Sequence, residues 1–294
     1  MKPLIAPGSY VVAVSGGVDS MVLLDLLAKQ PDLKLTVAHF DHGMREDSAE
    51  DRRLVQKVAQ AHGLPFVYHQ GQLGPGTSEA TARKARYEFL HKVRTAALAQ
   101  AIVTAHHQDD LLETAIINML RGTGRRGLSS LKSQDRVLRP LLLYEKKQIQ
   151  DYARAHHLEW REDSTNQDEA YLRNYVRRNI LNKFSEDQRQ QLLVHLNTAS
   201  ELNHDLEELL ANQLHIQPAV HKLDRQWFIQ LPHAVAKEVI ASWLRERGVT
   251  FDTKTLERLL VAAMTYQPHK RIDVNSGWFM EVKQAYLALN SRDR

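Results

Sequence analysis

The sequence predicts an α/β fold in which an open, mostly parallel, doubly wound sheet is followed by a second, smaller, mainly helical domain. The chain has 294 residues, of which 43% are hydrophobic, so it can bury one sizeable core and is long enough for a second domain. Its first half alternates short apolar runs with helical patterns, as parallel sheets wound with helices do. From about Phe184 the pattern changes to long amphipathic helices. We therefore expect two domains, over residues 1–185 and 186–294.

The strands expected in the first domain are nearly continuous apolar runs, which is typical of strands that helices cover on both faces. These runs are Tyr10–Val14, Leu35–His39, Phe66–His69 and Ile102–Ala105, and a fifth strand ends at Arg139-Pro140. Helical patterns fill the gaps between them, over Met21–Lys29, Glu46–Ala61 and Ser78–Ala99. Thr77 or Ser78 is placed to cap the last of these helices.

The second domain is expected to be helical and to end in a β-hairpin. Leucines recur at helical spacing from Leu192 to Leu210, and two further helices are expected at Ala234–Arg247 and Thr253–Met264. The hairpin strands are Arg271–Val274 and Trp278–Val282, around a turn at Asn275-Ser276-Gly277. No other strand is predicted in this region. Its leucine and tryptophan stripes indicate a core rather than a ligand site.

Composition excludes several classes of site. The chain has no cysteine, which excludes disulfides, thiolate zinc or iron-sulfur sites and a cysteine nucleophile. It shows neither a signal peptide nor an apolar run that could span a bilayer, so we expect a soluble, cytoplasmic protein with no membrane partner. Lys and Arg exceed Asp and Glu only by 39 to 35. Basic residues nevertheless gather in residues 83–94, 121–132 and 173–183, where each stretch fits a solvated helix face as well as a nucleic-acid contact.

The clearest local motif is Ser15-Gly16-Gly17-Val18-Asp19-Ser20, directly after the first predicted strand and at the start of a helix. Two glycines let the backbone approach a phosphate closely, the serine hydroxyls can donate hydrogen bonds, and the helix N-terminus favours an anion. The motif lacks the Gly-Lys-Ser/Thr of a Walker A loop and the third glycine of a dinucleotide fingerprint. It therefore predicts a phosphate-binding loop of another kind, whereas an ordinary strand-to-helix turn is the alternative.

A second cluster is Thr104-Ala105-His106-His107-Gln108-Asp109-Asp110-Leu111-Leu112-Glu113-Thr114, where another strand runs into a helix. On that helix Glu113 lies three residues from Asp110 and four from Asp109, so the carboxylates share one flank. Such a group of carboxylates can hold Mg²⁺ on ATP or bind an ammonium group. The simpler explanation of the acidic residues is a negatively charged first turn that stabilises the helix. The position at a strand's carboxyl end favours a binding site. Adjacent histidines point apart and no thiolate accompanies them, so no metal is assigned to His106 and His107.

The glycine-containing loop resembles the pyrophosphate loop of N-type ATP pyrophosphatases, the PP-loop superfamily, which cleave ATP between its α and β phosphates and transfer AMP to an oxygen. Further strings resemble the tRNA(Ile)-lysidine synthase family within it, in order over residues 10–180. They are His39-Phe40-Asp41-His42-Gly43-Met44-Arg45, Glu79 to Leu90, Leu120 to Leu128, Arg139-Pro140-Leu141-Leu142, Trp160 to Asn166 and Arg173-Asn174-Tyr175-Val176-Arg177.

The resemblance implies a PP-loop ATPase fold, similar to adenine nucleotide alpha hydrolases, and a ligase that uses ATP and Mg²⁺. In that family, O2 of the first anticodon cytidine in the CAU-anticodon isoleucine tRNA attacks the α-phosphorus of ATP, and pyrophosphate leaves. The ε-amine of L-lysine then displaces AMP at carbon 2, which changes the tRNA from methionine to isoleucine identity. The resemblance also makes a homodimer a reasonable expectation, with residues 186–294 as a tRNA-binding or substrate-specificity domain.

Residue roles implied by the resemblance fall into three groups. The phosphate-binding group is Ser15, Gly16, Gly17, Val18, Asp19 and Ser20, and Mg²⁺ arrives on ATP, next to Asp19 or Asp109. The catalytic group is Asp41, Arg83, Arg86, Asp110 and Glu113. Within it Asp110 and Glu113 recognise the lysine amine, the two arginines lie near the nucleotide or the target base, and Asp41 orients the base or assists proton transfer. The tRNA-contacting group is Arg121, Arg125, Arg126, Arg173 and Arg177.

Two other functions stay open from the residues alone. One is another AMP-forming PP-loop synthetase of the ammonia-fed NAD synthetase type, because tRNA thiolases and glutamine-fed synthetases need the cysteine that this chain lacks. The other is a non-catalytic nucleotide- or RNA-binding module, which the acidic cluster beside the loop disfavours. Some members of the family carry a further C-terminal tRNA-binding domain.

Overall fold

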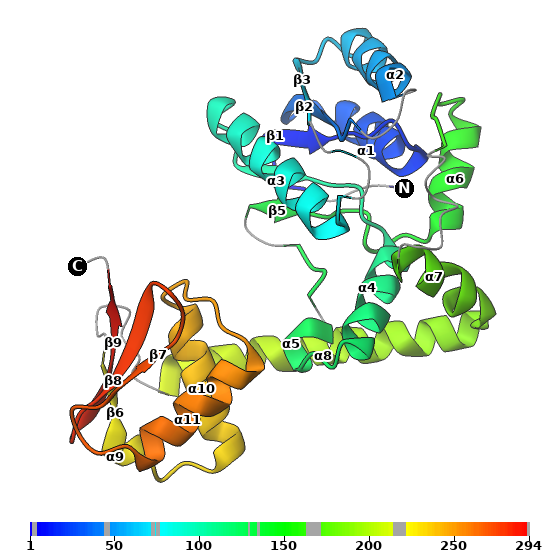
Figure 1. Ribbon diagram of the computed structural model, residues 1–294. Helices are drawn as coiled ribbons and strands as arrows, with labels where there is room; N and C mark the ends of the chain where they lie inside the picture. The colour runs from blue at the N-terminus through cyan, green and yellow to red at the C-terminus, as the bar shows by residue number, and fades with distance from the viewer. Residues whose placement is uncertain are drawn as a thin grey trace. The chain divides into compact units, whose positions relative to one another are not determined.

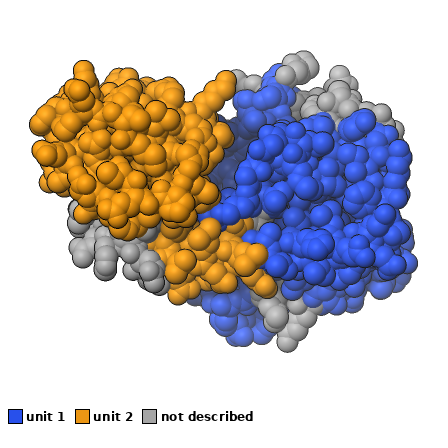
Figure 2. Space-filling view, turned by 90° about the horizontal axis from the view of Figure 1, so that it is seen from below, with its two compact units in different colours: residues 1–200 blue, residues 201–294 orange. Residues whose placement is uncertain are grey.

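The structure, a computed structural model, describes residues 1, 5–43, 48–71, 74, 77–128, 130–133, 136–162, 172–213 and 222–292. It comprises two compact units, Met1–Ser200 and Glu201–Arg294, coloured separately in Figure 2. Helix α8 (Glu186–Gln213) contains the division between them. The units therefore separate within a helix, whereas the sequence placed the domain boundary at the beginning of that helix.

The first unit is built on a five-stranded sheet with the strand order β3-β2-β1-β4-β5. Every neighbouring pair is parallel. The strands are β1 (Gly8–Ala13), β2 (Leu33–Asp41), β3 (Phe66–Gln70), β4 (Ala101–Val103) and β5 (Val137–Leu138). All five lie at the apolar runs, so the predicted α/β class with a parallel sheet is confirmed.

Helices cover both faces of this sheet (Figure 1). On one face, α1 (Val18–Ala28), α2 (Ser48–Ala61) and α6 (Lys146–Ala155) pack against alternate strand residues such as Val12 and Val37. On the other face, α3 (Glu79–Ala96) packs against Val11 and Ile102 through Leu90 and Val93. Ser78 caps α3 by accepting a hydrogen bond from the Thr81 N–H at 3.2 Å, as its position predicted.

The acidic helix has a separate apolar cluster on its far side. It is α4 (Gln108–Leu120), and it is followed by α5 (Arg125–Leu128), α7 (Leu172–Asn179) and the short 3₁₀ helix η2 (Leu181–Lys183). Leu112 and Ile116 of α4 pack with Val176 of α7 and with Leu193 and Leu196 of α8. This cluster anchors α4, whose N-terminal turn comes shortly after the end of β4.

The second unit contains a four-stranded antiparallel sheet with the order β6-β9-β8-β7. Its elements are β6 (Lys222–Asp224), α9 (Arg225–Phe228), α10 (His233–Arg245), α11 (Thr253–Thr265), β7 (Arg271–Asp273), β8 (Trp278–Val282) and β9 (Tyr286–Ser291). Strands β7 and β8 form the expected hairpin, but the expectation of no further strand is wrong. Strand β9 buries Leu287, Ala288 and Leu289 and pairs with both β8 and β6. Within the described ranges, no helix combines the length and apolar character needed to cross a membrane.

Candidate active site

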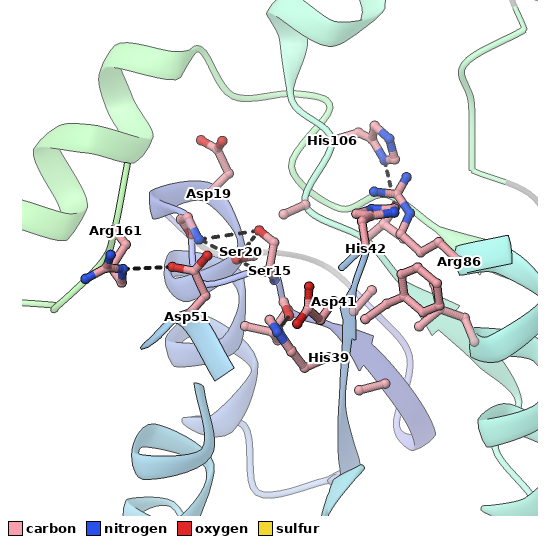
Figure 3. A pocket seen from close by; sticks show the side chains of 18 of the residues that line it. Ser15, Asp19, Ser20, His39, Asp41, His42, Asp51, Arg86, His106 and Arg161 are labelled. Atoms are coloured by element: carbon pink, nitrogen blue, oxygen red, sulfur yellow. Dashed lines mark hydrogen bonds and ion pairs between the residues drawn. The ribbon is translucent and has the colours of Figure 1, made fainter. Parts of the chain in front are cut away.

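A cavity of about 370 Å³ lies at the carboxyl edge of the parallel sheet (Figure 3). Residues that follow β1, residues of β2 and residues that follow β4 line it, among them Ser15, Asp41 and His106. The chain order reverses direction across the sheet between β1 and β4, and ligands of open α/β sheets bind at this kind of switch point. The cavity is also within the size range of small-molecule sites.

The predicted phosphate loop forms the floor of this cavity, and hydrogen bonds within the loop fix its conformation. Gly16 has φ of +96°, in the left-handed region that favours glycine, and Gly17 is the N-cap of α1. The Ser20 hydroxyl accepts hydrogen bonds from the backbone N–H groups of Ser15 (3.1 Å) and Gly16 (3.2 Å) and donates to the Gly17 carbonyl (2.9 Å). Because a glycine offers no side-chain cap, the positive end of α1 stays available to an anion.

Two residues outside the predicted site set brace the loop from the side. The backbone N–H of Arg161 donates to the Gly16 carbonyl at 3.0 Å, and the Arg161 Nε donates to Asp51 Oδ1 at 2.9 Å. Both residues line the cavity. Arg161 belongs to a string that the resemblance singled out, whereas Asp51 lies in the first turn of α2, and no local pattern marked it.

His39 connects β2 to the start of the loop. Its Nδ1 donates to the Val14 carbonyl at 2.9 Å, and burial lowers the pKa of the ring, so the imidazole is neutral. Its Nε2 is therefore an acceptor, and it is buried in the cavity wall with no hydrogen-bond partner among the described residues. Such an atom suits a ligand that brings a donor, because an unsatisfied buried acceptor costs free energy.

Asp41 lines the cavity, but both of its oxygens already accept hydrogen bonds. Oδ1 accepts from the Gly43 N–H and Oδ2 from the Ser48 hydroxyl, each at 2.8 Å. This geometry fixes the carboxylate at the end of β2. It suits orientation of a bound group better than proton abstraction.

The start of α4 forms the opposite wall of the cavity. His107 is its N-cap, and its backbone N–H donates to Asp110 Oδ2 at 2.9 Å while its ring Nδ1 accepts from the Asp109 N–H at 3.3 Å. Burial opposes ionisation of Asp110, but the neighbouring His107 and its backbone N–H outweigh burial and lower the pKa of this carboxyl group. Asp110 therefore presents a negative charge to the cavity.

Glu113 does not share this position, although it lies only one helical turn further along. Its side chain is 0% exposed and bound by Arg177, whose Nε and Nη2 donate to its two oxygens at 2.6 and 3.2 Å. Arg173 lies 3.5 Å from Glu113, 3.7 Å from Asp110 and 3.5 Å from Glu79. Arg173 and Arg177, two of the five arginines predicted to contact tRNA, are thus held by carboxylates.

This ion pair has consequences for the pKa values of both partners. Burial raises the pKa of Glu113, although Arg177 opposes that effect. Burial also opposes the charge on Arg177, but its hydrogen bond to Glu113 prevails and raises the pKa of the guanidinium. We regard both groups as charged, because Glu113 faces two guanidinium groups.

Of the two arginines predicted near the nucleotide, one lines the cavity. Arg86 does so, and burial lowers the pKa of its guanidinium. The Arg83 guanidinium instead lies over the Tyr87 ring, 4.8 Å from its centroid. Close to Arg86, burial lowers the pKa of His106 to about 3, and its Nδ1 lies 2.8 Å from the Thr104 hydroxyl.

The remaining arginines predicted to contact tRNA lie at the far end of α4. Arg121 is the C-cap of that helix, and Arg125 and Arg126 begin α5. At the usual helical rise, Arg121 is about 17 Å along the axis from Asp110. These three side chains therefore belong to a surface away from the cavity.

The residues present fit ATP and a metal ion carried by its phosphates. A glycine loop at an uncapped helix N-terminus suits phosphates, and the free Nε2 of His39 can accept from a base or ribose donor. Asp19 lines the cavity, and within the described part of the chain no group of three His, Asp or Glu side chains could hold a metal ion alone. Mg²⁺ commonly binds through one carboxylate and substrate phosphates, so Asp19, which lines the cavity, fits this role better than Asp109, which is not among the lining residues.

Known proteins are similar to this chain in sequence. The family model of the PP-loop domain matches residues 4–184. The tRNA(Ile)-lysidine synthase of Solibacter usitatus is 38% identical over 182 residues, covering 60% of this chain and 41% of the relative. The protein of the same name from Nitrosomonas europaea is 32% identical over 287 residues, covering 91% and 62%. The matched part thus spans less than two thirds of either relative.

A solved structure resembles the chain in fold alone. The U34-tRNA thiolase of Methanococcus maripaludis, with its 4Fe-4S cluster, aligns with a TM-score of 0.57 at 16% identity, covering 67% of this chain and 74% of the thiolase. The family match extends over more than half of the chain and includes the loop, the parallel sheet and the cavity. The chain therefore belongs to the PP-loop domain family.

Proposed function

We propose that the chain acts as a tRNA(Ile)-lysidine synthase, an AMP-forming ligase. It joins L-lysine to carbon 2 of the first anticodon cytidine in the CAU-anticodon isoleucine tRNA and releases AMP and pyrophosphate. The observation that carries the proposal is a single cavity with a phosphate loop on one side and the ionised Asp110 on the other. The names of the relatives support the same activity. A tRNA substrate places this activity in the cytoplasm.

In the first step, cytidine O2 attacks the α-phosphorus of ATP. The bond from that phosphorus to the bridging oxygen breaks, and pyrophosphate leaves with the electron pair. The loop from Ser15 to Ser20 and the start of α1 stabilise the charge that develops on the phosphates. Mg²⁺, when bound to ATP, neutralises part of this charge. Arg86 supplies a further cation in the cavity wall.

In the second step, the ε-amine of lysine attacks carbon 2, and AMP leaves with the electron pair of the bond to O2. Asp110 binds the incoming ammonium group, and its lowered pKa makes it a good ion-pair partner but a weak base. Glu113 acts on this site only indirectly, because Arg173 lies between the Glu113 and Asp110 carboxylates. The bound ammonium group loses a proton to water before it attacks, and holding the resulting amine beside carbon 2 raises the rate chiefly through proximity and orientation.

The tRNA contact is assigned first to Arg121, Arg125 and Arg126. They lie at the end of α4 that is far from Glu113, and Arg121 is exposed there. Arg173 and Arg177 are weaker candidates for phosphate contacts, because binding would have to separate them from carboxylates. If replacing the first three by Gln leaves both tRNA affinity and its salt dependence unchanged, this assignment is wrong.

The activity is tested with the protein, Mg²⁺, ATP and radiolabelled lysine. One reaction contains the isoleucine tRNA with a CAU anticodon, and a control contains the methionine tRNA with the same anticodon. Acid-stable label in the isoleucine tRNA alone, with AMP and pyrophosphate released, is the expected result. Turnover of nicotinate adenine dinucleotide with ammonia instead would identify an NAD synthetase type of enzyme. A homodimer is also part of the proposal, and sedimentation of the purified chain tests it.

A further inference from the structure

A lysine from a distant part of the chain sits at the edge of the phosphate loop. The Nζ of Lys146 donates to both oxygens of Asp19, at 2.6 and 2.7 Å. Asp19 is in the first turn of α1 and lines the cavity, while Lys146 is the first residue of α6. No role at this site was assigned to Lys146 from the sequence, because 127 residues separate it from Asp19.

The position of Lys146 is set by how α6 packs on α1. Ile149 and Ala153 of α6 are buried in the core that they share with α1. The Tyr152 hydroxyl donates to Asp25 of α1 at 2.8 Å, and the same carboxylate accepts from Lys29. These contacts hold the first turn of α6 next to the loop whether or not the Lys146 ion pair forms.

Stability does not account for the ion pair, because it is partly exposed to solvent. The side chains of Lys146 and Asp19 are 34% and 27% exposed, and pairs of this kind contribute at most about 1 kcal/mol. The pair does, however, place a mobile ammonium group beside an uncapped helix N-terminus. A polyphosphate carries several negative charges and competes well with one carboxylate for such a cation.

The geometry points to Lys146 as a phosphate-binding residue of the adenylation step, with Asp19 as its partner before ATP binds. When ATP binds, the Lys146 ammonium exchanges Asp19 for oxygens of the β and γ phosphates. It then stays with the pyrophosphate as that group leaves. The same exchange frees the Asp19 carboxylate for the Mg²⁺ that ATP carries. This inference deepens the proposed function and rests on it.

The test measures binding of inorganic pyrophosphate by calorimetry in EDTA, so that no metal ion contributes. The variant is Lys146→Met, which keeps the length and apolar stem of the side chain. Its matched control is Lys147→Met, which removes the same charge from the exposed neighbouring residue. Loss of a charge-assisted hydrogen bond predicts about 10-fold weaker binding or more for Lys146→Met, and less than about 2-fold for Lys147→Met.

A second pair of variants tests the exchange itself. In Asp19→Asn, Lys146 does not have to break an ion pair with residue 19 before it binds an anion. Pyrophosphate is therefore expected to bind more tightly to this variant than to the wild-type protein. In Asp19→Asn combined with Lys146→Met, most of that gain is expected to disappear. Thermal unfolding of each variant in the same buffer checks that α6 still packs on α1.

The outcomes separate this inference from the proposed function. Equal pyrophosphate affinity in Lys146→Met and Lys147→Met, with binding by the wild-type protein intact, overturns the role of Lys146 alone. Failure of the wild-type protein to bind either pyrophosphate or Mg²⁺-ATP overturns the proposed function and the inference together. Weaker binding in Lys146→Met alone, together with the loss of the Asp19→Asn gain, supports the exchange.

Discussion

Two junctions of the same kind lie side by side in the sheet and have opposite electrostatic character. In the first, β1 leads through Ser15–Gly17 into α1, and in the second, β4 leads through Thr104–His107 into α4. Both helices begin at the carboxyl edge of the sheet, and both turns line the cavity. Nevertheless, the first presents backbone N–H groups and the second presents a carboxylate.

The difference arises from the residue at each N-cap. Gly17 leaves the start of α1 without a side-chain acceptor, so its positive end can receive an anion. At the start of α4, His107 and Asp110 form a reciprocal capping box that uses the N–H groups of that turn. A carboxylate placed there neutralises the helix end and extends negative charge into the cavity. The turn residues, rather than the topology, therefore determine which charge each junction binds.

The largest effect is expected from removing the charge behind the acidic junction. Glu113→Gln leaves Arg177 and Arg173 facing a neutral group in a site where Glu113 is 0% exposed. Breaking a buried pair on one side costs several kcal/mol, and the partial exposure of Arg177 reduces the expected loss of unfolding free energy to about 2–3 kcal/mol. Urea unfolding measures it. Asp19→Asn at the other junction is the control, and it should cost less than about 1 kcal/mol because its pair with Lys146 is exposed. Equal costs would contradict the contrast between the junctions.

The next effect concerns the backbone of the phosphate loop. Gly16→Ala forces an L side chain to a φ of +96°, with its Cβ 3.4 Å from the Asp51 Cβ, so it should destabilise the protein by about 1–2 kcal/mol and weaken ATP binding. Gly17→Ala is the matched control, because Gly17 has a φ of −73° and its Cβ would be 3.6 Å from the nearest atom, the Ser15 hydroxyl oxygen. Its unfolding free energy should stay within about 0.5 kcal/mol of wild type. A Gly16→Ala variant as stable as Gly17→Ala would show that the loop tolerates another shape.

Local sequence patterns predicted the strands and helices that meet at the two junctions. They did not predict the contacts that residues from distant parts of the chain make there. Apolar runs predicted each strand of the parallel sheet, because strands that helices cover on both faces are apolar along most of their length. The three-residue spacing of Asp110 and Glu113 predicted one shared flank, yet α4 turns Asp110 to the cavity and buries Glu113 against α7.

Contacts between distant parts of the chain left no local pattern. Arg161 meets Asp51 across 110 residues, and Lys146 meets Asp19 across 127, so neither pair could be read from spacing. Strand β6 has only three residues and depends on β9 for its pairing. The missed strand β6 and the missed site residues share this cause.

A smaller effect should distinguish the junctions by pH. Burial lowers the pKa of His106, in the acidic junction, to about 3, whereas the unfolded chain takes up this proton near pH 6.5. Stability should therefore fall as the pH decreases from 6.5 towards 3, because only the unfolded state gains the proton in that range. Between pH 7 and pH 5 the loss is at most about 2 kcal/mol, and partial solvent access reduces it to about 1 kcal/mol.

His106→Gln removes this contribution, so the variant should lose less stability than the wild-type protein when the pH is lowered to 5. Replacement of the exposed His62 by Gln is the control, since it removes a histidine at the end of α2, away from both junctions. Chemical unfolding at the two pH values measures the difference. Parallel pH dependence in all three proteins would show that His106 takes up its proton without hindrance in the folded state.

The smallest change in stability accompanies the variant that makes the first junction resemble the second. Gly17→Ser gives α1 a side-chain cap, since Gly17 already has the extended backbone of an N-cap and an added Cβ would come no closer than 3.6 Å to another atom, the Ser15 hydroxyl oxygen. The unfolding free energy should rise by a few tenths of a kcal/mol. Pyrophosphate affinity should nevertheless fall, because the new hydroxyl accepts from the N–H groups that otherwise receive the anion. Unchanged affinity in a stabilised Gly17→Ser protein would mean that the anion binds elsewhere than at the start of α1, and the contrast between the two N-caps would then not explain which charge each junction binds.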